Sequence, residues 1–264
     1  MAKVLKVTKI ASKMLIALGF VLIIFLTPLN VFAVEPFVLS DGFSFEDISE
    51  DFELSIDEKS NFDDNIYIRR KDLRLLKFKC FGFDGEIYNG ELVVAYEATN
   101  PITKEVTNVS KEVLEILKEL FEKEYPIDKI SCFYFRNIGE TDRLSQHAYG
   151  LAIDINYNKN PCLIIDENGE ILRTIPKDLE KYADRTLEEK GMIKIGDDCY
   201  NAFTKRFWEW GGSWDNPKDF MHFQKFPSDY PKPEPKYKKT TVDPKDPIAI
   251  DPKYPIIIEP IEED

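Results

Sequence analysis

SQHAYGLAID, residues 145–154, is the stretch that decides the fold. From Leu151 to Ile155, large apolar residues alternate with Ala152 and Asp154, a period of two that predicts a β-strand with two different faces. Gly150 comes just before this strand, where a missing side chain lets the backbone turn tightly or approach another segment. We therefore expect a turn that leads into a rigid strand carrying Asp154.

The only two histidines of the chain are candidate metal ligands. His147 lies seven residues before Asp154, and His222 lies in the run Asp219-Phe-Met-His222-Phe223, where His222 and Gln224 share one face of an alternating stretch. Neutral imidazoles and carboxylates are usual ligands of a hydrolytic zinc, and three protein ligands leave a fourth position open for water. We predict a zinc site on His147, Asp154 and His222.

Two further residues are candidates for catalysis. Asp219 lies three residues before His222, close enough to reach the same cavity as a general base whose pKa is raised by desolvation. The alternative is that Asp219 only orients the His222 segment. Arg136 could stabilise an oxyanion or hold a substrate carboxylate, or it could be an ordinary ion-paired surface arginine. Ser145 is a candidate for substrate binding.

Hydrophobic periodicity predicts several strands, including an antiparallel edge of a sheet, and two helices. Strands joined by tight turns are expected over 73–83 and 92–96, and further strands over 130–135 and 151–155. A helix capped by Asn108 or Ser110 is expected to end before Tyr125-Pro126. A second helix is expected over 199–210, capped by Asp198 and stopped by Gly211-Gly212, with aromatic residues along its inner face.

The two ends of the chain differ in composition from its middle. Residues 1–33 combine four lysines, a short apolar run and small residues before Val34, which predicts a signal peptide; an uncleaved signal anchor is the alternative. Residues 34–65 are acidic and lack useful periodicity, so we expect a spacer. The folded domain is expected over 66–226. The tail, 227–264, holds nine of the sixteen prolines and is expected to be extended and disordered.

The net charge narrows the possible binding partners. Removing residues 1–33 takes away four lysines and no acid, which leaves 31 basic against 48 acidic residues and a formal net charge of −17. Such a charge argues against binding to nucleic acid or to anionic lipid.

Four cysteines in an exported chain allow up to two disulfides in three connectivities. None has the close pairing of a cysteine zinc site, so disulfides or buried free thiols are favoured over metal ligands.

Residues 145–154 and 219–223 resemble the two signature segments of the zinc D-alanyl-D-alanine carboxypeptidase and L-alanyl-D-glutamate peptidase family, the VanY-like peptidases of peptidoglycan. The similarity includes Arg136 and the Trp-Gly-Gly-Ser-Trp run over 210–214, and extends over roughly residues 70 to 226. It implies one zinc ion per chain on the three predicted ligands, an acidic base at position 219 and an arginine assisting at the carbonyl. It also implies a small α+β domain with a central antiparallel sheet and packed helices.

The resemblance implies a metallopeptidase that cleaves peptidoglycan stem peptides. Together with the predicted signal peptide, we expect a monomer that is secreted or associated with the cell envelope and has no stable membrane insertion after signal cleavage. An aspartate at position 219 is more similar to the endopeptidase branch than to the carboxypeptidase branch. One alternative is a catalytically inactive peptide-binding scaffold with a structural zinc. Another is a closed structural zinc completed by Cys132 or Cys162, which would abolish the water site.

Overall fold

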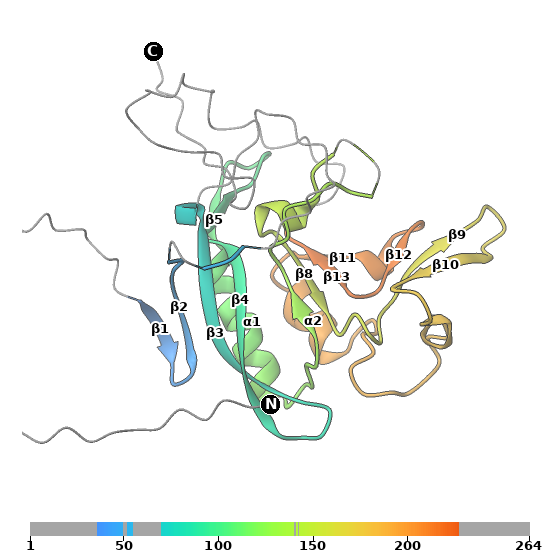
Figure 1. Ribbon diagram of the computed structural model, residues 1–264, viewed down its shortest axis with the longest axis horizontal. Coiled ribbons are helices and arrows are strands. Elements are labelled where there is room, and N and C mark those ends of the chain that lie inside the picture. Colours follow the sequence, from blue (N-terminus) through green and yellow to red (C-terminus); the bar gives the residue numbers. More distant parts are fainter. Residues whose placement is uncertain (1–35, 50–51, 55–69, 140, 142, 227–264) are drawn as a thin grey trace, which may run out of the picture. The chain divides into compact units, whose positions relative to one another are not determined.

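A computed structural model of the chain describes residues 36–49, 52–54, 70–139, 141 and 143–226 (Figure 1). The strands are β1 (Phe37–Ser40), β2 (Phe43–Asp47), β3 (Leu73–Phe81), β4 (Ile87–Ala95), β5 (Glu97–Thr99), β6 (Val106–Asn108), β7 (Ile130–Ser131), β8 (Ala152–Ile155), β9 (Cys162–Ile165), β10 (Ile171–Ile175), β11 (Glu209–Trp210), β12 (Lys218–Asp219) and β13 (His222–Gln224). The helices are α1 (Val109–Glu122) and α2 (Asp198–Thr204), with 3-10 turns η1 (Arg70–Asp72), η2 (Gln146–Tyr149), η3 (Glu180–Ala183) and η4 (Gly211–Ser213).

Antiparallel sheets and two packed helices confirm the predicted α+β class. One sheet has the order β1-β2-β3-β4, and a second has the order β11-β13-β8-β7. A smaller sheet has the order β10-β9-β12, and its strands alternate along the sequence with those of the second sheet. Strand β5 pairs with β6. The named strand pairs in these sheets are antiparallel. No helix within the described ranges is long and apolar enough to cross a membrane.

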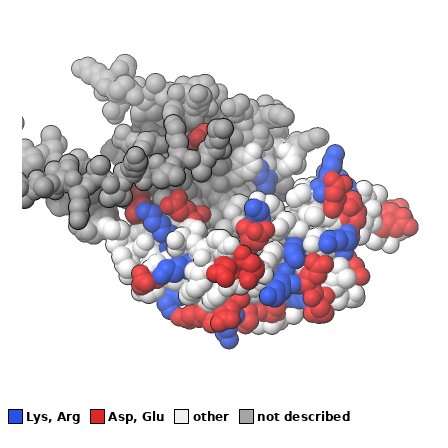
Figure 2. All heavy atoms as spheres, turned by 60° about the horizontal axis from the view of Figure 1, so that its bottom comes forward, with Lys and Arg blue, Asp and Glu red and all other residues white. Residues whose placement is uncertain are grey.

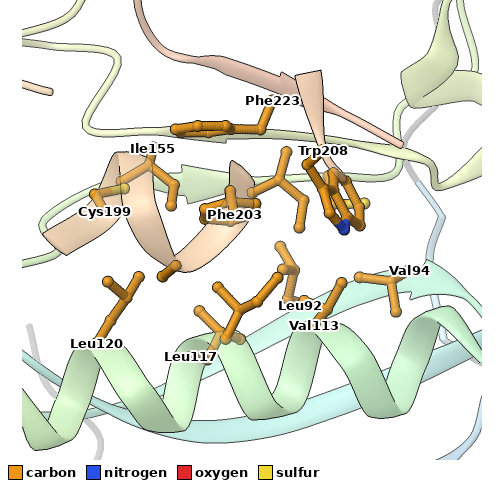
Figure 3. Close-up of a cluster of buried hydrophobic side chains, with 14 of the residues drawn as sticks. Leu92, Val94, Val113, Leu117, Leu120, Ile155, Cys199, Phe203, Trp208 and Phe223 are labelled. Atoms are coloured by element: carbon orange, nitrogen blue, oxygen red, sulfur yellow. The ribbon is translucent and has the colours of Figure 1, made fainter. Parts of the chain in front are cut away.

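Helix α1 supplies one side of the main hydrophobic core. Its N-cap is Asn108, whose side chain accepts a hydrogen bond from the backbone N–H of Lys111. Val113, Leu117 and Leu120 share the buried face, with less than 2% of each residue exposed. Figure 3 shows this face turned toward side chains of α2, β8 and β13. The core therefore fixes the back of the sheet whose strands carry Asp154 and His222.

The predicted spacer is wrong where the structure describes it. Residues 37–40 and 43–47 form β1 and β2, and β2 pairs with β3. Phe43 and Phe45 are buried, and the ring of Phe45 stacks on that of Phe37 with centroids 4.7 Å apart. The acidic residues of β2 face basic residues across the strand pair, where Glu46 binds Lys77 at 2.6 Å and Asp47 binds Arg74 at 3.1 Å.

Two predicted elements are shorter than expected. Helix α2 ends at Thr204, and its N-cap is Asp197 rather than Asp198. The backbone turns at Phe207, which has a left-handed φ of 62°, so that residues 209 and 210 leave the helix and pair with β13. The strand expected over 130–135 is limited to Ile130–Ser131. The predicted signal segment and proline-rich tail lie outside the described residues.

Gly150 is a position where only glycine is compatible with the fold. It has a φ of +66°, and an added Cβ would lie 2.5 Å from the backbone nitrogen of Ala95. The Gly150→Ala variant is expected to lose about 2 kcal/mol or more of unfolding free energy, since a left-handed conformation and a backbone clash act together. Gly169→Ala is the matched control, because Gly169 has a φ of +83° but open space around it.

Chemical denaturation of both glycine variants measures this difference. The control isolates the cost of the left-handed backbone, which is about 1–2 kcal/mol. Equal losses in the two variants would show that the close approach of the segment before β8 to the end of β4 contributes nothing to stability.

Candidate metal centre

His147 is held by a short 3-10 turn. The hydroxyl oxygen of Ser145 accepts a hydrogen bond from the His147 backbone N–H at 3.2 Å, and Gly150 ends the turn in a left-handed conformation. The imidazole is buried, with 2% of the residue exposed. Its Nδ1 lies 2.6 Å from the backbone carbonyl oxygen of Cys132, which can only accept a hydrogen bond. Nδ1 therefore carries the proton in neutral His147, and the lone pair is on Nε2.

Asp154 and His222 lie opposite each other on neighbouring strands. The register of β8 and β13 pairs His222 with Asp154 directly. Antiparallel cross-strand neighbours have side chains on the same face of a sheet, about 5 Å apart at Cβ. Nδ1 of His222 is 3.0 Å from Oδ1 of Asp154. The alternation that the sequence shows over 151–155 thus places the carboxylate beside the second histidine.

The three side chains converge on one point. Nε2 of His147 is 3.2 Å from Oδ1 of Asp154 and 3.2 Å from Nδ1 of His222. Zinc–ligand bonds of about 2.0–2.1 Å in a tetrahedron give ligand–ligand distances of about 3.3 Å. One ligand atom from each residue therefore lies close to the spacing that a tetrahedral metal ion requires.

The protons of the two imidazoles support the presence of a cation. Nε2 of His222 is 3.2 Å from Oε1 of Gln224. If Nε2 donates to this oxygen, Nδ1 of neutral His222 is a lone pair, like Nε2 of His147. A carboxylate oxygen and two nitrogen lone pairs then face one another, an arrangement that needs a bound cation or an extra proton between them. Among the described residues, these three form a group that could hold a metal ion.

The pKa shifts of Asp154 and His222 also support a site that binds a cation. Burial opposes the charge on Asp154, but His147 and His222 outweigh burial and hold the pKa of this carboxyl well below its usual range. Burial opposes the charged form of His222, yet its hydrogen bond to Asp154 raises the pKa of the imidazole. Asp154 is therefore ionised and available as a ligand, and the site as a whole favours positive charge.

Asp219 reaches the same site from a different sheet. It lies on β12 opposite Cys162 of β9. Gly211 permits this placement, since a Cβ there would lie 2.7 Å from the Asp219 backbone oxygen. Oδ1 of Asp219 is buried without a hydrogen-bond partner among the described residues. Burial raises the pKa of Asp219 to about 6, so this carboxyl exchanges its proton near neutral pH.

The part of the chain that carries this site is similar to a known protein family. Residues 139–225 match the family model described as D-alanyl-D-alanine carboxypeptidase. This match confirms the family resemblance predicted from the sequence and supports a peptidase of the D-alanyl-D-alanine carboxypeptidase type. No curated protein and no solved structure matches the chain. The matched range contains His147, Asp154, His222 and Asp219.

Arg136 lies outside the range that matches the carboxypeptidase family, three residues before its start. Its guanidinium donates to the backbone oxygen of Asn137 at 3.2 Å and lies 5.8 Å from the centre of the Tyr134 ring. These contacts join it to its own segment and not to the three converging side chains. A role at the substrate carbonyl stays a prediction.

Ser145 has a structural contact that the sequence did not predict. It is buried, and its hydroxyl oxygen caps the turn that carries His147. Substrate binding by Ser145 stays a prediction, while the positioning of His147 is visible.

All four cysteines are buried free thiols, which is one of the two states that the sequence left open. Neither Cys132 nor Cys162 belongs to the group of converging ligands. Cys132 instead contributes its backbone oxygen to His147. The proposal of a closed zinc site completed by a cysteine is therefore not supported by the arrangement of these side chains.

Three residues next to the site were not among the predicted site residues. Gln224 contacts His222, and Glu209 contacts Gln224. The ring of Trp214 lies 5.4 Å from that of His222. The sequence pattern places Gln224 on the strand face of His222 but indicates no role for it, and Trp214 is named only as part of the 210–214 run. Glu209 could not have been found, because it falls inside the predicted helix.

Proposed function

We propose that this chain is an exported zinc metallopeptidase that hydrolyses an amide bond in peptidoglycan stem peptides. The observation that carries the proposal is the convergence of Nε2 of His147, Oδ1 of Asp154 and Nδ1 of His222 within 3.0–3.2 Å of one another. Three ligands leave a tetrahedral ion with one open position, as catalytic zinc sites do. The match to the D-alanyl-D-alanine carboxypeptidase family supports the substrate class.

The metal and Asp219 divide the chemistry between them. Zinc, when bound, supplies a Lewis acid and lowers the pKa of a water at its open position to about 7. Asp219 is proposed as the general base that accepts a proton from the attacking water and passes it to the departing amine. Burial raises the pKa of Asp219 to about 6 without metal, and a bound cation lowers it from there, so the carboxylate is free to accept a proton at neutral pH.

Asp219 also favours an enzyme over an inactive scaffold. A peptide-binding module with a structural metal has no need for a carboxyl group near the metal ligands whose pKa is raised to about 6 by burial. Such a group is costly to retain unless it has a task. The proposal therefore includes catalysis as well as binding.

The acidic net charge of the protein argues against a polyanionic partner and does not distinguish among small peptide substrates. On the face shown in Figure 2, acidic and basic side chains are mixed over the described residues. We propose that the protein acts outside the cytoplasm as a monomer, released or held at the cell envelope. The predicted signal peptide and the location of peptidoglycan support this placement.

Digestion of purified peptidoglycan by the protein, with and without a chelator and with zinc added back, tests the proposal. Mass spectrometry is expected to find new products that disappear with the chelator and return with zinc. Loss of a single alanine would identify a carboxypeptidase, and release of a longer fragment would identify an endopeptidase. Zinc binding without any product would contradict the proposal and favour the peptide-binding scaffold.

A further inference from the structure

Glu209 and Gln224 form a polar pair that neither the metal ligands nor the proposed reaction includes. Gln224 lies on β13, two residues after His222, and Glu209 lies directly opposite Gln224 on β11. Nε2 of Gln224 donates to Oε2 of Glu209 at 2.7 Å, and Oε1 of Gln224 is 3.2 Å from Nε2 of His222. Gln224 is buried, with 2% of the residue exposed. The polar side chains thus run without a break across three strands, from Glu209 to Asp154.

The donors and acceptors in this row leave one consistent assignment. A carboxylate can only accept, so Glu209 fixes the NH₂ group of Gln224 on its own side. The amide oxygen of Gln224 must then face His222, and it also can only accept. Nε2 of His222 is therefore the protonated nitrogen of the neutral ring, and Nδ1 is the lone pair.

We propose that Glu209 and Gln224 are a positioning pair that selects Nδ1 of His222 as the metal-facing nitrogen. The inference rests on the proposed zinc site and adds the means by which this chain holds its second histidine in one tautomer. Without the pair, neutral His222 could place its proton on Nδ1 and donate it to Asp154, whose Oδ1 is 3.0 Å away. In that tautomer His222 and Asp154 would hydrogen-bond to each other, and Nδ1 of His222 would have no lone pair for the metal.

The two histidines are fixed by different means, which explains why only one needs a side-chain pair. His147 donates Nδ1–H to the backbone oxygen of Cys132, so its ligating atom is Nε2. The acceptor for Nε2 of His222 is the side-chain amide of Gln224 on the same strand, β13, and this amide could rotate by half a turn. Glu209 removes that freedom. Partners outside the ligand shell commonly orient metal-binding histidines and alter metal affinity about 10–100-fold.

Zinc affinity, measured by competition with a chelator, tests the pair. Gln224→Met keeps the side-chain length but removes the acceptor, and is expected to weaken zinc binding about 10–100-fold. Glu209→Leu is expected to weaken it less, since Gln224 can still adopt the correct orientation. Glu209→Gln removes the charge but keeps an acceptor, so recovery toward the wild-type affinity would distinguish a hydrogen bond from simple attraction of the cation.

A double-mutant cycle tests whether Glu209 acts through Gln224. Adding Glu209→Leu to Gln224→Met is expected to change affinity less than about twofold, because the residue through which Glu209 acts is already gone. Additive losses would overturn the proposal. Gln146→Met is the matched control, since Gln146 is next to the other histidine and its Oε1 has no hydrogen-bond partner among the described residues. It is expected to keep wild-type affinity.

The ligating nitrogen can be read directly by nuclear magnetic resonance in the cadmium-loaded, ¹⁵N-histidine protein. Metal–nitrogen coupling is expected at Nδ1 of His222 and at Nε2 of His147, with the His222 coupling weakened or mixed in Gln224→Met. Coupling at Nε2 of His222 in the wild type would overturn the proposed role of the pair but not the zinc site. A wild-type protein that binds zinc but cleaves no peptidoglycan would contradict the proposed function and leave the pair standing; failure to bind zinc at all would overturn both.

Discussion

The His222→Ala variant is expected to lose zinc binding and peptidase activity together. Nδ1 of His222 lies 3.0 Å from Oδ1 of Asp154 and 3.2 Å from Nε2 of His147, so its removal takes away one of three converging ligand atoms. Ligand that binds only the folded state stabilises it by about 4 kcal/mol at a thousand times its Kd. Thermal unfolding of the wild type should therefore shift to higher temperature with zinc, and that of the variant should not shift.

Cys132→Ala and Cys162→Ala are the controls for the histidine variant. Both thiols are buried and neither belongs to the converging group. The cysteine variants are expected to bind one zinc ion per chain and to show the wild-type shift with zinc. Loss of zinc in either one would instead support a closed structural site. Retained hydrolysis by His222→Ala would contradict the assignment of the metal centre.

The metal ligands could be predicted because they lie in short, local sequence patterns. Strand β8 shows its alternation over only a few residues, and Gly150 marks the turn before it. With two histidines in the chain, few combinations of ligands were possible. The cross-strand register of His222 with Asp154 was not needed to name these residues, although it is what brings them together.

Elements that depend on distant partners were not predicted. Strand β2 has the alternating Phe43 and Phe45, but its acidic residues resemble a solvated spacer until their basic partners on β3 are known. Residues 205–210 continue the helical pattern of α2 in sequence. Pairing of β11 with β13 outweighs that local preference, and this pairing is what places Glu209 beside Gln224.

The Asp219→Asn variant is expected to keep zinc and to lose about 10²–10⁴-fold in kcat, the usual contribution of a general base. An amide has nearly the shape of the carboxylate but cannot accept the proton of the attacking water. Asp219 is not among the three converging ligand atoms, so metal content should remain at one ion per chain. Asp215→Asn makes the same change at an exposed carboxylate of the preceding loop and is expected to leave kcat unchanged.

The pH profile of the wild type separates a base from a residue that only orients His222. A general base works in its deprotonated form, and burial raises the pKa of Asp219 to about 6 in the metal-free protein. A bound cation favours the carboxylate and lowers that pKa, so kcat should hold at neutral pH and fall on the acid side at or below about pH 6. This acid limb should be absent from the residual activity of Asp219→Asn. If it persists there unchanged, another group titrates, and Asp219 acts by orienting the segment that carries His222.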